Sequence, residues 1–272
     1  MKRWPTYYIP HGGGPCFFMD TPPGIPTNTW ESMADFLRNI DTELGERPSA
    51  VIVISAHWQR TNPTIHIGAK PELLYDYYGF PPHTYELTYP MSGAPELATE
   101  IADLLKGEGF TPEFEEKRGI DHGIFIPFKL IYPDADVPIV QLSMLRGDSP
   151  EDHIRLGRAL EPLRDKGVLI IGSGLSFHNL RTFFHQPRAT DPGSVQFDDW
   201  LTESVLTSDH REERLSTWET APFARACHPT EEHLLPLMVA AGAAPEEAGV
   251  QVFSDIVLGK AVSGYRFGEI TH

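Results

Sequence analysis

Cysteine is scarce in this chain, which has only Cys16 and Cys227 among its 272 residues. Two cysteines cannot build a disulfide framework, and so low a number is typical of a protein from a reducing compartment. No apolar run approaches the length of a membrane span, and no apolar segment follows the basic residues at the N-terminus. We therefore expect no signal peptide, no membrane partner and a cytoplasmic location.

Positive charge is also in short supply. Lysine and arginine total 22 against 38 aspartates and glutamates, so the formal net charge is −16. Such a surface repels phosphate backbones, which argues against nucleic acid as a partner. Internal repeats and low-complexity tracts are absent, and 40% of the residues are hydrophobic, enough to bury a core. We predict a single domain over residues 1–272, and the sequence leaves its oligomeric state open.

Several common site motifs are missing as well. The chain has no HExxH and no CxxC. The glycines at 12–14 are not followed by the Gly-Lys-Ser/Thr of a phosphate loop. Residues 172–176 read Gly-Ser-Gly-Leu-Ser, which lacks the Gly-x-Ser-x-Gly order of a nucleophile elbow. Both glycine-rich stretches are therefore interpreted as turns.

Short apolar runs and helical periodicities alternate along the chain. The expected strands are residues 7–9, 50–55, 137–142 and 168–171, with a closing β-rich segment at 250–267. The expected helices are residues 94–106, a helix from Ser149 towards Arg164 that Pro162 kinks or ends, and a helix that opens at Thr230. Ser149 and Pro150 have the residue types of an N-cap and a first helical position. This alternation predicts an α/β sandwich with a mixed sheet.

Histidine is abundant, with twelve residues in contexts of two kinds. Seven lie in polar or loop-like surroundings and are expected to be solvated or locally hydrogen-bonded: His66, His83, His153, His185, His210, His228 and His272. Five others lie at expected element ends or beside small residues: His11, His57, His122, His178 and His233. Loops at the carboxyl ends of strands line one edge of an α/β sheet, so these five side chains could converge. Three neutral imidazoles suit Zn²⁺ or Fe²⁺, and two more could move protons, although spacing leaves open which three bind metal.

The order of motifs resembles the class III extradiol ring-cleaving dioxygenases, the superfamily of the protocatechuate 4,5-dioxygenase catalytic subunit. The branch it resembles most is the DOPA 4,5-extradiol dioxygenase family. The motifs that carry the resemblance are residues 10–15 (PHGGGP), 54–58 (ISAHW), 78–81 (YGFP), 89–90 (YP), 119–123 (GIDHG), 132–138 (YPDADVP), 178–180 (HNL) and 228–233 (HPTEEH).

By this resemblance, the fold is a three-layer α/β/α sandwich around a mixed, mostly parallel sheet. His11, His57 and His233 match the metal ligands. His178 matches an acid/base histidine and possible fourth metal contact, and His122 a second acid/base histidine. The implied activity is Fe(II)-dependent cleavage of a catechol such as DOPA or caffeate with O₂ to a ring-opened semialdehyde, and Zn(II) is also a plausible occupant.

Two departures from the family pattern and two other functions stay open. Many relatives have His-Gly-Ser-Pro where residues 11–15 read His-Gly-Gly-Gly-Pro, which predicts a differently shaped first loop. In the wider superfamily that the chain resembles, the third ligand is a glutamate, whereas His233 occupies the matching place here, as in the DOPA branch. Glu231 and Glu232 precede His233 directly, so the sequence leaves open which of these side chains coordinates the metal. The alternative functions are a zinc-dependent hydrolase that uses metal-activated water and a non-catalytic metal-binding protein.

Overall fold

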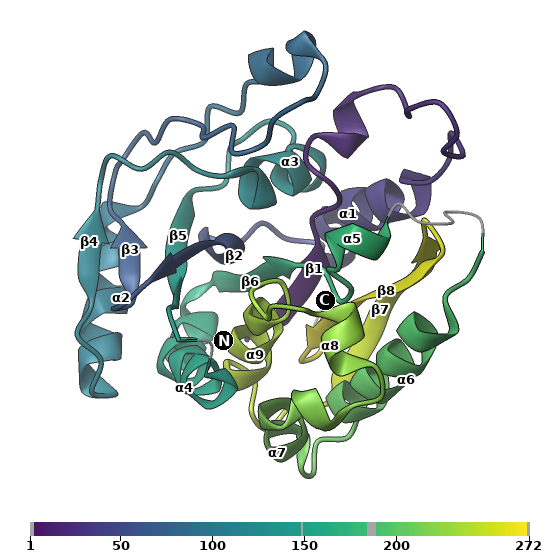
Figure 1. Ribbon diagram of the computed structural model, residues 1–272. Helices are drawn as coiled ribbons and strands as arrows, with labels where there is room; N and C mark the ends of the chain where they lie inside the picture. The colour runs from purple at the N-terminus through teal and green to yellow at the C-terminus, as the bar shows by residue number, and fades with distance from the viewer. Residues whose placement is uncertain (1–2, 148, 184–188, 271–272) are drawn as a thin grey trace.

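A single mixed sheet forms the centre of the computed structural model, which describes residues 3–147, 149–183 and 189–270 (Figure 1). Its strands are β1 (Thr6–Pro10), β2 (Ala50–Arg60), β3 (Thr64–His66), β4 (Glu113–Glu115), β5 (Ile139–Leu145), β6 (Val168–Gly174), β7 (Gly249–Val257) and β8 (Lys260–Phe267). Their order is β4-β3-β5-β2-β6-β1-β8-β7. The four central strands β5, β2, β6 and β1 run parallel, whereas β7 and β8 form the expected closing hairpin, in which β8 pairs antiparallel with β1. The predicted mixed, mostly parallel sheet is thus confirmed.

Helices cover both faces of this sheet, as Figure 1 shows. They are α1 (Glu31–Leu44), α2 (Pro95–Gly107), α3 (His122–Ile131), α4 (Pro150–Leu160), α5 (Leu180–Phe183), α6 (Pro192–Leu206), α7 (Arg211–Ser216), α8 (Ala224–Cys227) and α9 (Leu235–Gly242). Helices α1 and α3 pack together on one face, and α2, α4, α9 and α6 lie on the other. The predicted three-layer α/β/α sandwich is confirmed. Within the described residues, no helix combines the length and the apolar character that crossing a bilayer requires.

The start of α4 follows its sequence signal. The Ser149 hydroxyl accepts a hydrogen bond from the Asp152 backbone N–H at 3.1 Å, and Pro150 occupies the first turn. The α-helix ends at Leu160 and continues as a 3₁₀ turn that contains Pro162, as the proline predicts. Local side-chain chemistry therefore determines both ends of this helix.

Strand β2 is longer than predicted and irregular in the segment that contains His57. It extends to Arg60 rather than ending at Ser55. Its pairing with β5 shifts register between Ile54 and Gln59, while its pairing with β6 stops at Ser55. A bulge re-aims side chains and ends regular pairing. His57 lies in this irregular part of β2, just after the pairing with β6 has ended.

The predicted helix start at Thr230 is wrong, because α9 begins only at Leu235. The Glu231 carbonyl accepts hydrogen bonds from the backbone N–H groups of Leu234 and Leu235, so the preceding residues form a turn that holds His233. This turn lies directly on β6. A Cβ at Gly174 would lie 2.1 Å from the His233 carbonyl oxygen, a distance that only glycine permits.

Candidate metal centre

The five histidines singled out in the sequence lie together at one edge of the sheet. His11 follows β1, His57 lies in the bulge of β2, and His178 follows β6, so three of them come from the neighbouring strands β2, β6 and β1. His122 is the first residue of α3, and His233 lies in the turn before α9. Ring centroids are 4.7 Å apart for His11 and His57, 5.2 Å for His11 and His233, and 3.3 Å for His178 and His233.

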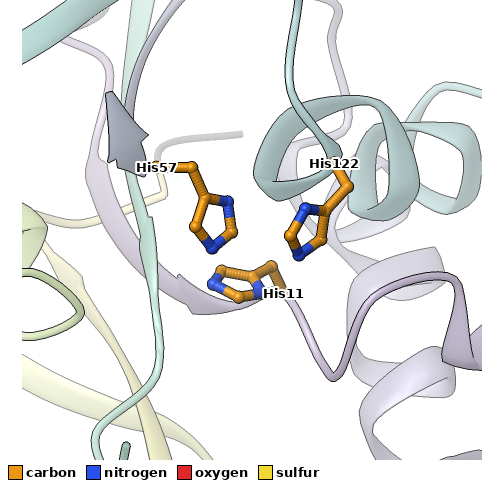
Figure 2. A group of neighbouring side chains, drawn as sticks. All are labelled: His11, His57 and His122. Atoms are coloured by element: carbon orange, nitrogen blue, oxygen red, sulfur yellow. The ribbon is translucent and has the colours of Figure 1, made fainter. Parts of the chain in front are cut away.

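Figure 2 shows three of these rings pointing towards one another from β1, β2 and α3. One ring nitrogen each of His11, His57 and His122 lies within 4.8 Å of the others. His178 and His233 form a second such group with Glu232. The groups meet where His57 Nε2 and His233 Nε2 are 3.1 Å apart.

The distance between these two nitrogens fits two ligands of one metal ion. Bonds of about 2.1 Å at right angles place neighbouring ligand nitrogens about 3 Å apart. His11 is also prepared for ligation: its Nδ1 is 2.9 Å from the Gly12 carbonyl, to which it donates a hydrogen bond as the N–H tautomer. That tautomer leaves a lone pair on Nε2, which is buried without a hydrogen-bond partner among the described residues. The donor set therefore fits a metal ion.

Burial favours the neutral imidazoles that metal binding requires. Burial lowers the pKa of His11 well below its usual value, and the neighbouring imidazoles lower it further. Burial has the same effect on the pKa of His233, although Glu232 opposes it. Neutral rings present a lone pair at pH 7, so no proton has to be displaced from them before a metal binds.

The Glu232 carboxylate contacts the Nδ1 atoms of two site histidines. Its Oε1 lies 3.3 Å from His233 Nδ1 and 3.5 Å from His178 Nδ1. Burial alone would raise the pKa of Glu232, but contacts with these two rings hold it well below its usual range. Glu231 instead pairs with Arg225. Of the two glutamates left open by the sequence, Glu232 is thus the one that contacts site histidines.

A buried carboxylate network holds the bulge of β2. Asp121 is fully buried and accepts hydrogen bonds from the Ser55 hydroxyl (2.6 Å), the Arg118 guanidinium (3.0 Å) and the Gln141 amide (2.5 Å). Burial would raise its pKa, but the His57 ring, Arg118 and Ser55 lower it well below the usual range. Asp121 Oδ1 is 3.6 Å from His57 Nδ1, so a negative charge faces Nδ1, while Nε2 of the same ring faces His233.

Asp76 is a site residue that the sequence analysis missed. Its Oδ1 accepts hydrogen bonds from the backbone N–H of His122 at 2.9 Å and from His122 Nδ1 at 2.7 Å. This arrangement selects the Nδ1–H tautomer and leaves Nε2 free to accept a proton. Burial lowers the pKa of His122, while Asp76 opposes that shift. No motif marks Asp76, which lies 46 residues away from its partner.

A cavity of about 540 Å³ lies in front of the five histidines. All five line it, together with the glycines at 12–14, Asp76 and a set of mainly apolar side chains that includes Trp30, Tyr77, Phe80 and Leu175. A concave, mostly apolar space with a few convergent polar groups is the usual form of a small-molecule site. Substrate could thus approach the imidazoles from this cavity.

Most of the other histidines are locally hydrogen-bonded, as expected. His66, His153 and His228 are buried, with ring nitrogens 2.6–2.8 Å from backbone carbonyls. His83 and His210 are more exposed and contact the Phe18 carbonyl and Glu213 respectively. His185 and His272 lie outside the described residues.

Comparison with known proteins identifies a family of aromatic ring-opening dioxygenases. The family model for the catalytic LigB subunit of aromatic ring-opening dioxygenase matches residues 5–266. The chain is 39% identical to the dioxygenase tasH of Hapsidospora irregularis, covering 97% of this chain and 85% of that protein. It is 38% identical to the 4,5-DOPA dioxygenase extradiol of Beta vulgaris, covering 91% and 89%. A crystal structure of an uncharacterized protein from Escherichia coli K12 superposes with a TM-score of 0.78 at 27% identity, covering 98% of this chain and all of that one.

Proposed function

The chain belongs to the family of the catalytic LigB subunit of aromatic ring-opening dioxygenases, and from this premise we propose the metal, the ligands and the substrate class of its reaction. It is a metal-dependent extradiol dioxygenase that acts on a small aromatic molecule and O₂. We propose that His11, His57 and His233 bind Fe²⁺, with His178 as a possible fourth contact. We also propose that the whole chain acts as one catalytic domain, since a single sheet carries the strands that present these ligands.

The observation that carries the ligand assignment is the convergence of three ring nitrogens. His57 Nε2 and His233 Nε2 are 3.1 Å apart, and His11 Nε2 is buried beside them without a hydrogen bond within the described part of the chain. An unpartnered buried acceptor costs about 1–3 kcal/mol, a cost that a bound cation removes. Fe²⁺ held there would supply open coordination positions and redox chemistry towards O₂, whereas Zn²⁺ at the same nitrogens is redox-inactive.

Proton transfer is assigned to the two remaining histidines. His178 stacks on His233 and lines the cavity, so it is placed to take a proton from a catechol hydroxyl and return it during ring cleavage. His122 presents its Nε2 while Asp76 holds Nδ1–H, so it can serve as the second acid/base group. The carbon–carbon bond beside the hydroxyls breaks, both oxygen atoms enter the product, and a ring-opened semialdehyde results.

The substrate is proposed to be a catechol of the DOPA or caffeate type. Support comes from the relatives in Beta vulgaris, Mirabilis jalapa and Escherichia coli, which are named 4,5-DOPA dioxygenase extradiol and are 31–38% identical to this chain. The cavity has aromatic and aliphatic walls that suit a flat ring.

Oxygen uptake by protein reconstituted anaerobically with Fe²⁺ tests this proposal. DOPA and caffeate are the substrates, and metal content is measured on the same samples. We expect His57→Ala to lose both metal and activity, and His178→Ala to keep metal but lose oxygen uptake. His210→Ala, at an exposed histidine, is the matched control and should behave as wild type. Full metal content and activity in His57→Ala would refute the ligand assignment, and no uptake by protein that holds one Fe²⁺ would refute the proposed substrate class.

A further inference from the structure

The cavity in front of the histidines has room for more than a catechol ring. Its volume of about 540 Å³ lies within the range of roughly 300–1,000 Å³ that is typical of cavities enclosing drug-sized ligands. The lining includes the five histidines and, along the first loop, Asp20 and Ile25. The cavity therefore offers these further residues to the ring substituent of a substrate at the metal centre.

Aromatic side chains packed against the glycine-rich loop form one wall of this space. The Phe80 ring lies so close to Gly14 that a Cβ there would be 2.8 Å from it. The Tyr77 ring meets both Phe80 and His122 edge-on, with centroids 5.5 and 5.6 Å apart. Trp30 lies beside Gly13, 3.6 Å from the position of a Cβ, which is an ordinary contact distance. Gly14 thus lets the Phe80 ring approach the loop, and these rings give the substituent an apolar surface.

The fixed charges of the cavity lining are negative. Asp20 and Asp76 line it, whereas no lysine or arginine does so among residues 3–147, 149–183 and 189–270. The Asp76 carboxylate already accepts two hydrogen bonds from His122. Asp20 is exposed and carries a carboxylate for which the described residues provide no hydrogen bond or ion pair.

Two nearby cations, Arg118 and Lys129, have partners outside the cavity lining. The Arg118 guanidinium bonds to Asp121 and lies over the Trp58 ring. The Lys129 ammonium donates to the Thr88 carbonyl. An anionic substituent in the cavity would therefore leave water for an apolar wall and an acidic side chain, and the described lining includes no lysine or arginine to pair with it.

We propose that, among the catechols this site accepts, the cavity favours those with a cationic or neutral substituent over those with an anionic one, such as caffeate, and that Asp20 is the residue that discriminates between them. The selection acts through attraction of a substituent ammonium group and repulsion of a substituent carboxylate. This inference rests on the proposed ring-cleaving function, whose site it shares.

Three compounds with the same ring and carbon chain test the proposal at pH 6, where the ammonium group of an amino-acid ester is protonated. DOPA methyl ester then has a cationic substituent, DOPA a zwitterionic one, and N-acetyl-DOPA an anionic one. With Fe²⁺-reconstituted protein, kcat/KM from oxygen uptake is expected to fall in that order. Asp20→Asn should lower the ratio of kcat/KM for the ester to that for the N-acetyl compound by about two- to fivefold, the effect of one partly exposed charge pair. Asp20→Lys should lower it further.

The control variant is Asp103→Asn, which removes the same charge from the surface of α2, where Asp103 pairs with Lys106. It should leave the ratio unchanged. The inference is overturned if wild type prefers N-acetyl-DOPA to the ester, or if neither Asp20 variant changes the ratio. A failure of the proposed function looks different, because none of the three compounds would then support oxygen uptake.

Discussion

Asp198 is a carboxylate buried on α6, away from the candidate metal centre. Its side chain is packed beneath β8, and the residue is 7% exposed. Oδ2 accepts a hydrogen bond from the Ser263 hydroxyl at 2.8 Å, whereas Oδ1 has no partner among the described residues. Burial raises the pKa of Asp198 from 3.8 to about 6, although Ser263 opposes the shift.

This shift fixes the sign and the size of a pH effect on stability. Because the pKa is higher in the folded state, the folded protein binds this proton more tightly. Protonated Asp198 therefore makes a favourable contribution to the free energy of unfolding, which is fully present below pH 3.8 and is lost as pH rises through about 6. Relative to the fully protonated carboxyl, a shift from 3.8 to about 6 lowers the free energy of unfolding by about 3 kcal/mol at pH 8 and by about 1.5 kcal/mol at pH 5. Asn at this position carries no charge and keeps an acceptor oxygen for Ser263.

We therefore expect Asp198→Asn to be more stable than wild type by up to about 3 kcal/mol at pH 8, with the gain roughly halved at pH 5. Urea unfolding at the two pH values measures the difference. Asp199→Asn is the matched control, because Asp199 is the next residue and is exposed; its effect should stay within about 0.5 kcal/mol at both pH values. A gain for Asp198→Asn that is absent, or equal at pH 5 and pH 8, would refute the reasoning.

Three further outcomes are expected at the candidate site. Asp76→Asn should lower kcat by about tenfold or more at unchanged metal content, because it weakens the contact that fixes the tautomer of His122; equal kcat for both proteins would contradict this. Gly174→Ala should weaken metal binding by about tenfold or more in a chelator competition, because its Cβ would displace the His233 turn. Gly107→Ala, where nothing lies within 4 Å of the new Cβ, is its control. Chelation should lower the melting temperature of the metal-loaded protein, since the ligands converge only in the folded state; an unchanged temperature would argue against a bound metal.

The predictable parts of the fold are those decided by neighbouring residues. Apolar runs identified the central strands, and the Ser149 cap and Pro162 bounded α4 as expected. The boundaries that failed depend on distant segments. Strand β2 continues past Ser55 because β5 still pairs with it after β6 has separated. The turn before α9 rests on Gly174 of β6, a contact that helix signals near Thr230 do not contain.

In the candidate site, too, some residues could be predicted from their neighbours in sequence, and others depend on distant segments. The residue types and their positions beside strand ends and glycines pointed to five histidines, and the order of motifs pointed to the family. Asp76 and Glu232 became part of the site only through the tertiary structure, which brings them to His122 and to His233.

Residue type, periodicity and motif order are properties of the sequence, and they were enough to indicate the fold class, the family and the set of candidate ligands. The folded arrangement was needed to show which nitrogens face one another, which carboxylates hold them and which charges line the cavity. Those properties depend on distances of a few ångströms between segments far apart in the chain, and sheet pairing and helix packing set those distances.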